Sequence, residues 1–194
     1  MTLSAATSIV PFAAPDGSPS TDVSAFADAL DYVELMNYDI FGGWSSVVGP
    51  NAPLNDTCAP GADQQGSAVS AIAAWTSAGF PANKIVLGVG SYGHSFHVNE
   101  DDAYADATST STQPPGTTAL AAYPSFDGSQ QPLGDSWDAI EPAGVDDCGN
   151  ESAGGPSGIF NFRGLIEKGL LDEDGNPVSG MGFRYDDCSQ TVRG

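Results

Sequence analysis

Three stretches of the chain carry residue types that could do chemistry. Tyr38 and Asp39 place a hydroxyl beside a carboxylate, which could orient a reacting group and stabilise positive charge, although the pair alone also fits a strand end with a capped turn. His94 and His97 lack the cysteine or carboxylate neighbours of a metal site. The acidic run at residues 172–176 has its glycine fourth, whereas an EF-hand loop needs it sixth. We therefore expect no metal and no cofactor.

The net charge of the chain limits its partners. The 194 residues include 5 basic and 25 acidic ones, a formal net charge of −20. Such a surface repels phosphate backbones and anionic bilayers, so we expect neither nucleic acid nor a membrane as a partner. Hydrophobic residues make up 40% of the chain, which is enough for one core. No stretch approaches the roughly 20 consecutive apolar residues of a spanning helix.

The elements that would position Tyr38 lie in the first ninety residues, where apolar patterns alternate between strand and helix periods. Helical spacing places apolar residues on one face of each helix: Val23, Phe26, Ala27 and Leu30 in the first, and Val69, Ile72 and Ala73, with Trp75 as a further candidate, on the buried face of the second. Tyr38 would end a strand that runs into a glycine-rich loop. The predicted strands cover residues 3–12, 32–38 and 84–89, and the predicted helices cover about 23–30 and 67–77. This order favours an α/β fold.

Strand and helix stop alternating after Gly90. From there to about Gly158, Gly, Pro, Ser, Thr and Asp surround single aromatic residues, which favours short antiparallel strands with long connections. A helix is predicted near residues 162–171 and a last strand near 181–185. Three strand-helix units are too few for a parallel barrel, which needs eight in about 250 residues. Either partners cover the open sheet or the chain is a piece of a larger domain.

Three motifs in order carry a resemblance to a known family. The first is Leu-Met-Asn-Tyr-Asp at residues 35–39, with Gly-Gly-Trp at 42–44 and Asn-Ala-Pro-Leu at 51–54 after it. The second is Gly-Val-Gly-Ser-Tyr-Gly-His-Ser-Phe at 88–96. The third is Phe-Arg-Tyr-Asp-Asp-Cys-Ser-Gln-Thr at 183–191. With these three motifs in this order, the sequence resembles the glycoside hydrolase family 18 chitinases.

The resemblance implies a partial (β/α)8 TIM barrel. Residues 1–90 would form about strands five to seven, residues 91–188 the α+β insertion subdomain, and residues 189–194 a stub leading to the last barrel strand. The family's defining motif, Asp-x-x-Asp-x-Asp-x-Glu, ends in the glutamate that protonates the leaving oxygen. Its nearest approach here, Asp28 and Asp31, continues with Val33 and Leu35. We therefore expect this chain to lack the general acid.

The resemblance also implies roles in substrate-assisted hydrolysis, in which the acetamido carbonyl of the sugar attacks its own anomeric carbon. Tyr38 would donate its hydroxyl to the acetamido oxygen, and Asp39 would supply negative charge in the same pocket. Met36 would pack below the sugar. Trp44 would stack on a pyranose ring, the alternative being a loop anchor.

The resemblance places Tyr92 and Arg184 at sugar-contacting positions, and Trp137 could add a further contact. Tyr92 would line the cleft, although core packing explains it equally well. Arg184 would contact sugar hydroxyls, the alternative being a surface pair with Asp186 or Asp187. Trp137 would stack from the wall of the insertion.

The cysteines and two glycosylation sequons bear on the compartment. Cys148 and Cys188 both fall in the predicted insertion and could form a disulfide, which would leave Cys58 free or paired outside this chain. The sequons begin at Asn55 and Asn150. We expect a secreted protein, although residues 3–14 make a poor signal peptide because no Lys or Arg precedes them and Pro11 interrupts them.

Together these observations predict a chitinase-like protein that binds chitin or chito-oligosaccharides. In the complete enzyme, β-1,4 bonds would be hydrolysed with retention, whereas this chain alone is expected to be inactive. One alternative is a natural lectin-like chitin binder. Another is an interaction protein that self-associates through the open edges of its sheet.

Overall fold

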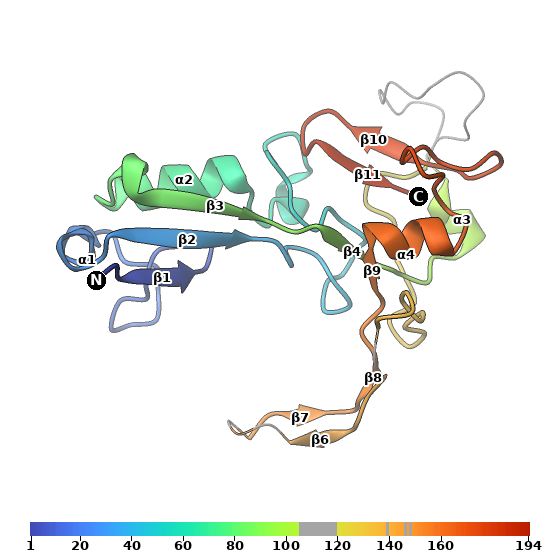
Figure 1. Cartoon of the computed structure of the whole chain (residues 1–194), viewed down its shortest axis with the longest axis horizontal. Helices are drawn as coiled ribbons and strands as arrows, with labels where there is room; N and C mark the ends of the chain where they lie inside the picture. Colours follow the sequence, from blue (N-terminus) through green and yellow to red (C-terminus); the bar gives the residue numbers. More distant parts are fainter. Residues whose placement is uncertain (105–119, 139, 146, 148) are drawn as a thin grey trace. The chain divides into compact units, whose positions relative to one another are not determined.

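The chain divides into two compact units. The computed structural model describes residues 1–104, 120–138, 140–145, 147 and 149–194 (Figure 1). Unit 1 comprises Met1–Ile40, Ala52–Gly90 and Asp186–Thr191. Unit 2 comprises Phe41–Asn51, Ser91–Tyr185 and Val192–Gly194.

Unit 1 is built on a parallel sheet in the order β1-β2-β3 (Figure 1). The strands are β1 (Ser4–Thr7), β2 (Tyr32–Asn37) and β3 (Ile85–Val89). The helices are α1 (Ser24–Ala29) and α2 (Ala68–Ser77), with 3-10 turns at Gly61–Asp63 (η1) and Ala82–Lys84 (η2). The described strands form an open parallel sheet flanked by helices and close no barrel, which agrees with the predicted partial α/β barrel.

The two faces of β2 differ in burial. Val33 and Leu35 are fully buried, whereas Glu34 and Met36 between them are exposed. Successive side chains in a strand point to opposite faces, so one face of the sheet is covered and the other is open. The covered face packs on Trp75 of α2 and forms the core of unit 1.

Helix α2 covers the sheet with small residues and one tryptophan. Ser67 caps its first turn through a reciprocal capping box with Ser70. Ala68, Ala71 and Trp75 are buried, so the backbone of the helix can approach the sheet closely. Val69 and Ile72, predicted as buried, are 50% and 37% exposed, and Phe26 in α1 is also exposed. The prediction was wrong for Val69 and Ile72 because Ala68, Ala71 and Trp75 face the sheet in their place.

Both outer edges of the sheet are open in the described part of the chain. β2 lies in the centre, and β1 and β3 each pair with β2 alone. An unpaired strand edge presents N–H and C=O groups that can pair with another strand. None of the described helices is long and apolar enough to cross a bilayer.

Unit 2 consists mainly of short antiparallel pairs, as predicted for this part of the chain. β4 (Tyr92–His94) pairs with β9 (Ile159–Asn161), β5 (Ile140–Glu141) with β8 (Gly155–Pro156), and β6 (Gly144–Val145) with β7 (Glu151–Ser152). Its helices are α3 (Glu100–Ala103) and α4 (Phe162–Glu167). A last pair, β10 (Arg184–Asp186) and β11 (Thr191–Arg193), has residues in both units.

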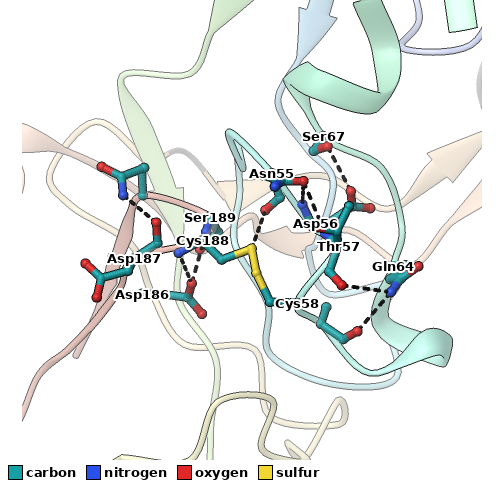
Figure 2. The surroundings of a disulfide bond; sticks show 12 residues. Asn55, Asp56, Thr57, Cys58, Gln64, Ser67, Asp186, Asp187, Cys188 and Ser189 are labelled. Atoms are coloured by element: carbon teal, nitrogen blue, oxygen red, sulfur yellow. Dashed lines mark hydrogen bonds between the residues drawn. A yellow bond between two sulfur atoms is a disulfide. The ribbon is translucent and has the colours of Figure 1, made fainter. Parts of the chain in front are cut away.

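A disulfide joins Cys58 to Cys188 within unit 1, with their Cα atoms 6.4 Å apart (Figure 2). The predicted pairing of Cys148 with Cys188 is therefore wrong, and Cys148 itself lies outside the described residues. The physical reason is that residue 188 is held against the loop of Cys58. Leu54 N–H donates to Ser189 O at 2.9 Å beside it. We paired Cys148 with Cys188 because both fall in the predicted insertion. The sequence gives no sign that Cys188 contacts the loop of Cys58.

Removing the disulfide should destabilise the protein. Because the bridge joins residues 130 positions apart, we expect Cys58→Ser combined with Cys188→Ser to lower the free energy of unfolding by about 2–5 kcal/mol, measured by chemical denaturation. Cys148→Ser, which leaves the Cys58–Cys188 disulfide intact, is the matched control. A non-reducing peptide map that links residues 148 and 188 would contradict the pairing.

Candidate functional site

Tyr38 and Asp39 directly follow β2, at the carboxyl end of the parallel sheet. Loops leave parallel strands at this end, and ligand sites of parallel α/β folds form there. Tyr38 is half-buried and Asp39 is exposed. Neither residue is sealed in the core of unit 1, so both can meet a ligand.

The ring of Tyr38 lies close to β3 because Gly88 has no side chain. Gly88 pairs with Met36, and paired residues point to the same face, here the open one. A Cβ atom added at Gly88 would lie 3.2 Å from Tyr38 Cε1 and 2.8 Å from Leu35 O. Gly88 thus fixes where the phenol ring can lie, on the face where Met36 is exposed.

The backbone of Asp39 is in the left-handed region, with a φ of 57°. A non-glycine residue in this region costs about 1–3 kcal/mol, and Asp tolerates it better than most residues do. The turn ends β2 and holds an exposed carboxylate beside Tyr38. Such strain gathers at functional sites, which favours a role for this carboxylate.

Asn37 anchors the same strand end from the covered face. Its side chain is fully buried, and Nδ2 donates to Pro53 O at 3.1 Å. Pro53 O also accepts from the backbone N–H of Ala68 at the start of α2, at 3.0 Å. We did not select Asn37 from the sequence, although the alternation along β2 could have placed it opposite Met36.

In unit 2, Trp44 belongs to an aromatic group with two neighbours. The rings of Trp44 and His94 meet edge to face with centroids 5.5 Å apart, and those of Tyr92 and His94 with centroids 5.8 Å apart. Asn51 Nδ2 donates to Tyr92 O at 2.8 Å. Trp44 remains 66% exposed, so its indole is held and still accessible. These contacts give His94 a packing role, which agrees with the expectation for a histidine without metal-ligand neighbours.

The other two predicted residues of unit 2 differ in exposure. Arg184 is only 9% exposed, and Nη1 donates to Leu120 O at 3.0 Å, so it is not the surface residue of our alternative interpretation. Trp137 is 74% exposed and borders a cavity. Met36, Tyr38 and Asp39 thus lie in unit 1, and the other four predicted residues lie in unit 2.

Metal binding finds no support in the residues that the structure describes. Among them, no three His, Cys, Asp or Glu side chains gather closely enough to hold an ion. His94 is instead part of the aromatic group around Trp44. At the acidic turn, Asp172 Oδ1 accepts from the backbone N–H groups of Asp174 and Asn176 at 3.0 and 2.8 Å. Its carboxylate stabilises the turn.

Comparison with known proteins gives matches over nearly the whole chain. The sequence profile of Glycosyl hydrolases family 18 matches residues 2–167. A chitinase-like effector of Moniliophthora roreri is 53% identical over 189 residues, which are 97% of this chain and 43% of that protein. The crystal structure of a chitinase from Rhizomucor miehei has a TM-score of 0.77 at 28% identity and covers 98% of this chain and 46% of its own.

A second solved structure shares the fold at lower similarity. It is a mutant class V chitinase of Nicotiana tobaccum in complex with NAG4, with a TM-score of 0.57 at 21% identity. The match covers 97% of this chain and 40% of the tobacco chain. The present chain therefore spans less than half the length of the relatives described here.

Adding a methyl group at Gly88 should disturb the strand end. Because the new Cβ would meet the backbone carbonyl of Leu35, we expect Gly88→Ala to lower the free energy of unfolding by about 1–3 kcal/mol. Gly93→Ala is the control, since a Cβ there meets no atom within 4 Å. Equal stability of the two variants in chemical denaturation would show that the contact at Gly88 is not tight.

Proposed function

This chain belongs to family 18 of the glycosyl hydrolases, and from that membership we propose that it binds chitin or chito-oligosaccharides. The observation that supports the proposal most is the position of Tyr38 and Asp39, accessible and adjacent at the carboxyl end of a parallel sheet. The tobacco chitinase that shares the fold was crystallised with NAG4. A bound N-acetylglucosamine unit would meet Tyr38 and Asp39 at this edge of unit 1.

Each of the two residues has a separate task in this proposal. The hydroxyl of Tyr38 donates a hydrogen bond to the acetamido oxygen of the sugar and so orients the carbonyl towards the anomeric carbon. The carboxylate of Asp39 stabilises the positive charge that develops on the ring and the acetamido nitrogen. Met36, exposed on the same face of the sheet, packs below the sugar. Gly88 and the left-handed turn hold both groups in place before the sugar arrives.

Residues of unit 2 would add contacts of their own. Trp44 is accessible and its ring packs against His94, and an exposed indole suits stacking on the apolar face of a pyranose ring. Tyr92 also contacts the ring of His94 and would contact sugar in the same aromatic group. Arg184 would donate to a sugar hydroxyl from its buried position.

We propose binding rather than hydrolysis for this chain alone. The sequence contains no Asp-x-x-Asp-x-Asp-x-Glu segment to protonate the leaving oxygen. A longer chain that carries this acid would hydrolyse β-1,4 bonds with retention, by the substrate-assisted route.

Secretion is part of the proposal. The Cys58–Cys188 disulfide supports it, because disulfides persist in oxidising compartments. The sequons at Asn55 and Asn150 agree with an extracellular protein.

The open edges of β1 and β3 favour a second candidate function, self-association. In this alternative, a strand of a second copy pairs with one of these edges. A dimer in sedimentation velocity would support self-association, and a monomer would exclude it.

Loss of the Tyr38 hydroxyl should weaken sugar binding. We expect Tyr38→Phe to raise the Kd for N-acetylglucosamine tetramer about three- to tenfold, as the loss of one hydrogen bond would, measured by isothermal titration calorimetry. Tyr32→Phe, at the other end of β2, is the matched control and should keep the Kd of the unchanged chain. Equal affinity of Tyr38→Phe and the unchanged chain would remove Tyr38 from the site.

The chain alone should not cleave chitin oligomers. We expect no products above the buffer blank when N-acetylglucosamine hexamer is incubated with it and analysed by mass spectrometry. Cleavage that persists through purification and is lost in Tyr38→Phe would mean that another residue supplies the acid.

A further inference from the structure

Unit 2 contains an open cavity of about 210 Å³ that is bordered by Trp137. Pockets for drug-sized molecules begin at about 300 Å³, so this cavity suits a ligand of one ring. Two carboxylates, those of Asp135 and Asp138, lie in its wall beside Ser157 and Asn161. All of these residues belong to unit 2.

Asp138 clamps the loop that carries Trp137. Its Oδ2 accepts from the backbone N–H groups of Gly134 at 2.8 Å and Gly158 at 2.9 Å. Its Oδ1 accepts from the hydroxyl and the backbone N–H of Ser157. Burial raises the pKa of Asp138, but these hydrogen bonds together outweigh burial and hold the pKa below its ordinary value. The carboxylate therefore stays ionised at neutral pH, and its acceptor positions are occupied.

Asp135 provides a second clamp on the same loop. Its Oδ2 accepts from the backbone N–H of Asn161 at 2.7 Å and from Asn161 Nδ2 at 3.1 Å. Its Oδ1 accepts from the backbone N–H of Trp137 at 2.8 Å. The hydrogen bond from the backbone N–H of Asn161 is the main reason that the pKa of Asp135 lies below its usual value, and the other hydrogen bonds lower the pKa further. The carboxylate of Asp135 thus links the backbone of Trp137 to Asn161 in β9.

Close packing leaves this loop little freedom. A Cβ at Gly134 would overlap the carbonyl of Ile159, and a Cβ at Gly164 would overlap the carboxylate of Asp135. Yet Trp137 in the same loop is 74% exposed. A rigid loop that holds a large aromatic side chain in solvent loses little conformational entropy when that side chain binds a ligand.

The chemistry of the cavity indicates an uncharged sugar. An indole face packs against the C–H groups of a pyranose ring, and carboxylates accept hydrogen bonds from hydroxyl groups. Asp135 and Asp138 use most of their acceptor positions on the protein, whereas Glu141 in the same wall is exposed, so its carboxylate can accept a hydrogen bond from a ligand. Ionised carboxylates in the wall repel sulfated or phosphorylated sugars.

We propose that Trp137 and this cavity form a binding site for one pyranose unit of a chito-oligosaccharide, with the ring on the indole face and a hydroxyl donating to Glu141. The identity of the sugar rests on the proposed function. The site itself rests on the cavity and on the clamped, exposed tryptophan.

The test is a titration of the whole chain with N-acetylglucosamine trimer, followed by calorimetry and by the indole N–H signals in NMR spectra. We expect the Trp137 indole signal to shift saturably, with no shift for the fully buried Trp75. Trp137→Ala should raise the Kd about tenfold. Leu133→Ala is the matched control, since Leu133 is 63% exposed in the same loop and does not border the cavity.

Each outcome decides the proposal. A shift of the Trp137 signal in the unchanged chain supports the site, even where the alanine variant fails to fold. Saturable binding without that shift, or equal losses in Trp137→Ala and Leu133→Ala, overturns the site and leaves the proposed function standing. Absence of any saturable binding overturns both.

Discussion

The alternation of side chains along β2 is the constraint on which the rest depends. Val33 and Leu35 must be buried against Trp75, because together with their neighbours they form the core of unit 1. Once they point to that face, Glu34 and Met36 must point to the other. The residues that follow the strand inherit this arrangement, with Asn37 buried on Pro53 and the ring of Tyr38 against Gly88. The burial of Val33 and Leu35 in the core therefore also determines where the side chains of the candidate site lie.

The end of the strand is fixed by contacts that come from far along the sequence. Pro53 O accepts from both Asn37 and the first turn of α2, and Leu54 N–H reaches Ser189 O. The disulfide to Cys188 closes the same region (Figure 2). Asp56 also stabilises this region, because its carboxylate accepts hydrogen bonds from Gly66 N–H and from the hydroxyl of the helix cap Ser67. A loop without regular structure is thus held firmly beside the candidate site.

Local patterns predicted the order of strands and helices in unit 1, and in unit 2 they predicted short antiparallel strands and the helix at Phe162 without the pairing of those strands. Periodicity gave the order in unit 1, since burial of one face leaves a repeat in the sequence. It did not give the buried face of α2, where alanines rather than Val69 and Ile72 meet the sheet. Cys58 was not assigned to Cys188, because contacts across 130 residues leave no local trace. The hydrogen bonds of the Asp135 and Asp138 carboxylates were also missed, because an aspartate in an irregular segment leaves no periodic pattern that names its partners.

A crystal structure of this chain with a bound chito-oligosaccharide tests the central claim most directly. The account predicts an acetamido oxygen within about 2.6–3.2 Å of the Tyr38 hydroxyl, with the Asp39 carboxylate on the same sugar unit. A sugar bound with no contact to either residue would contradict it.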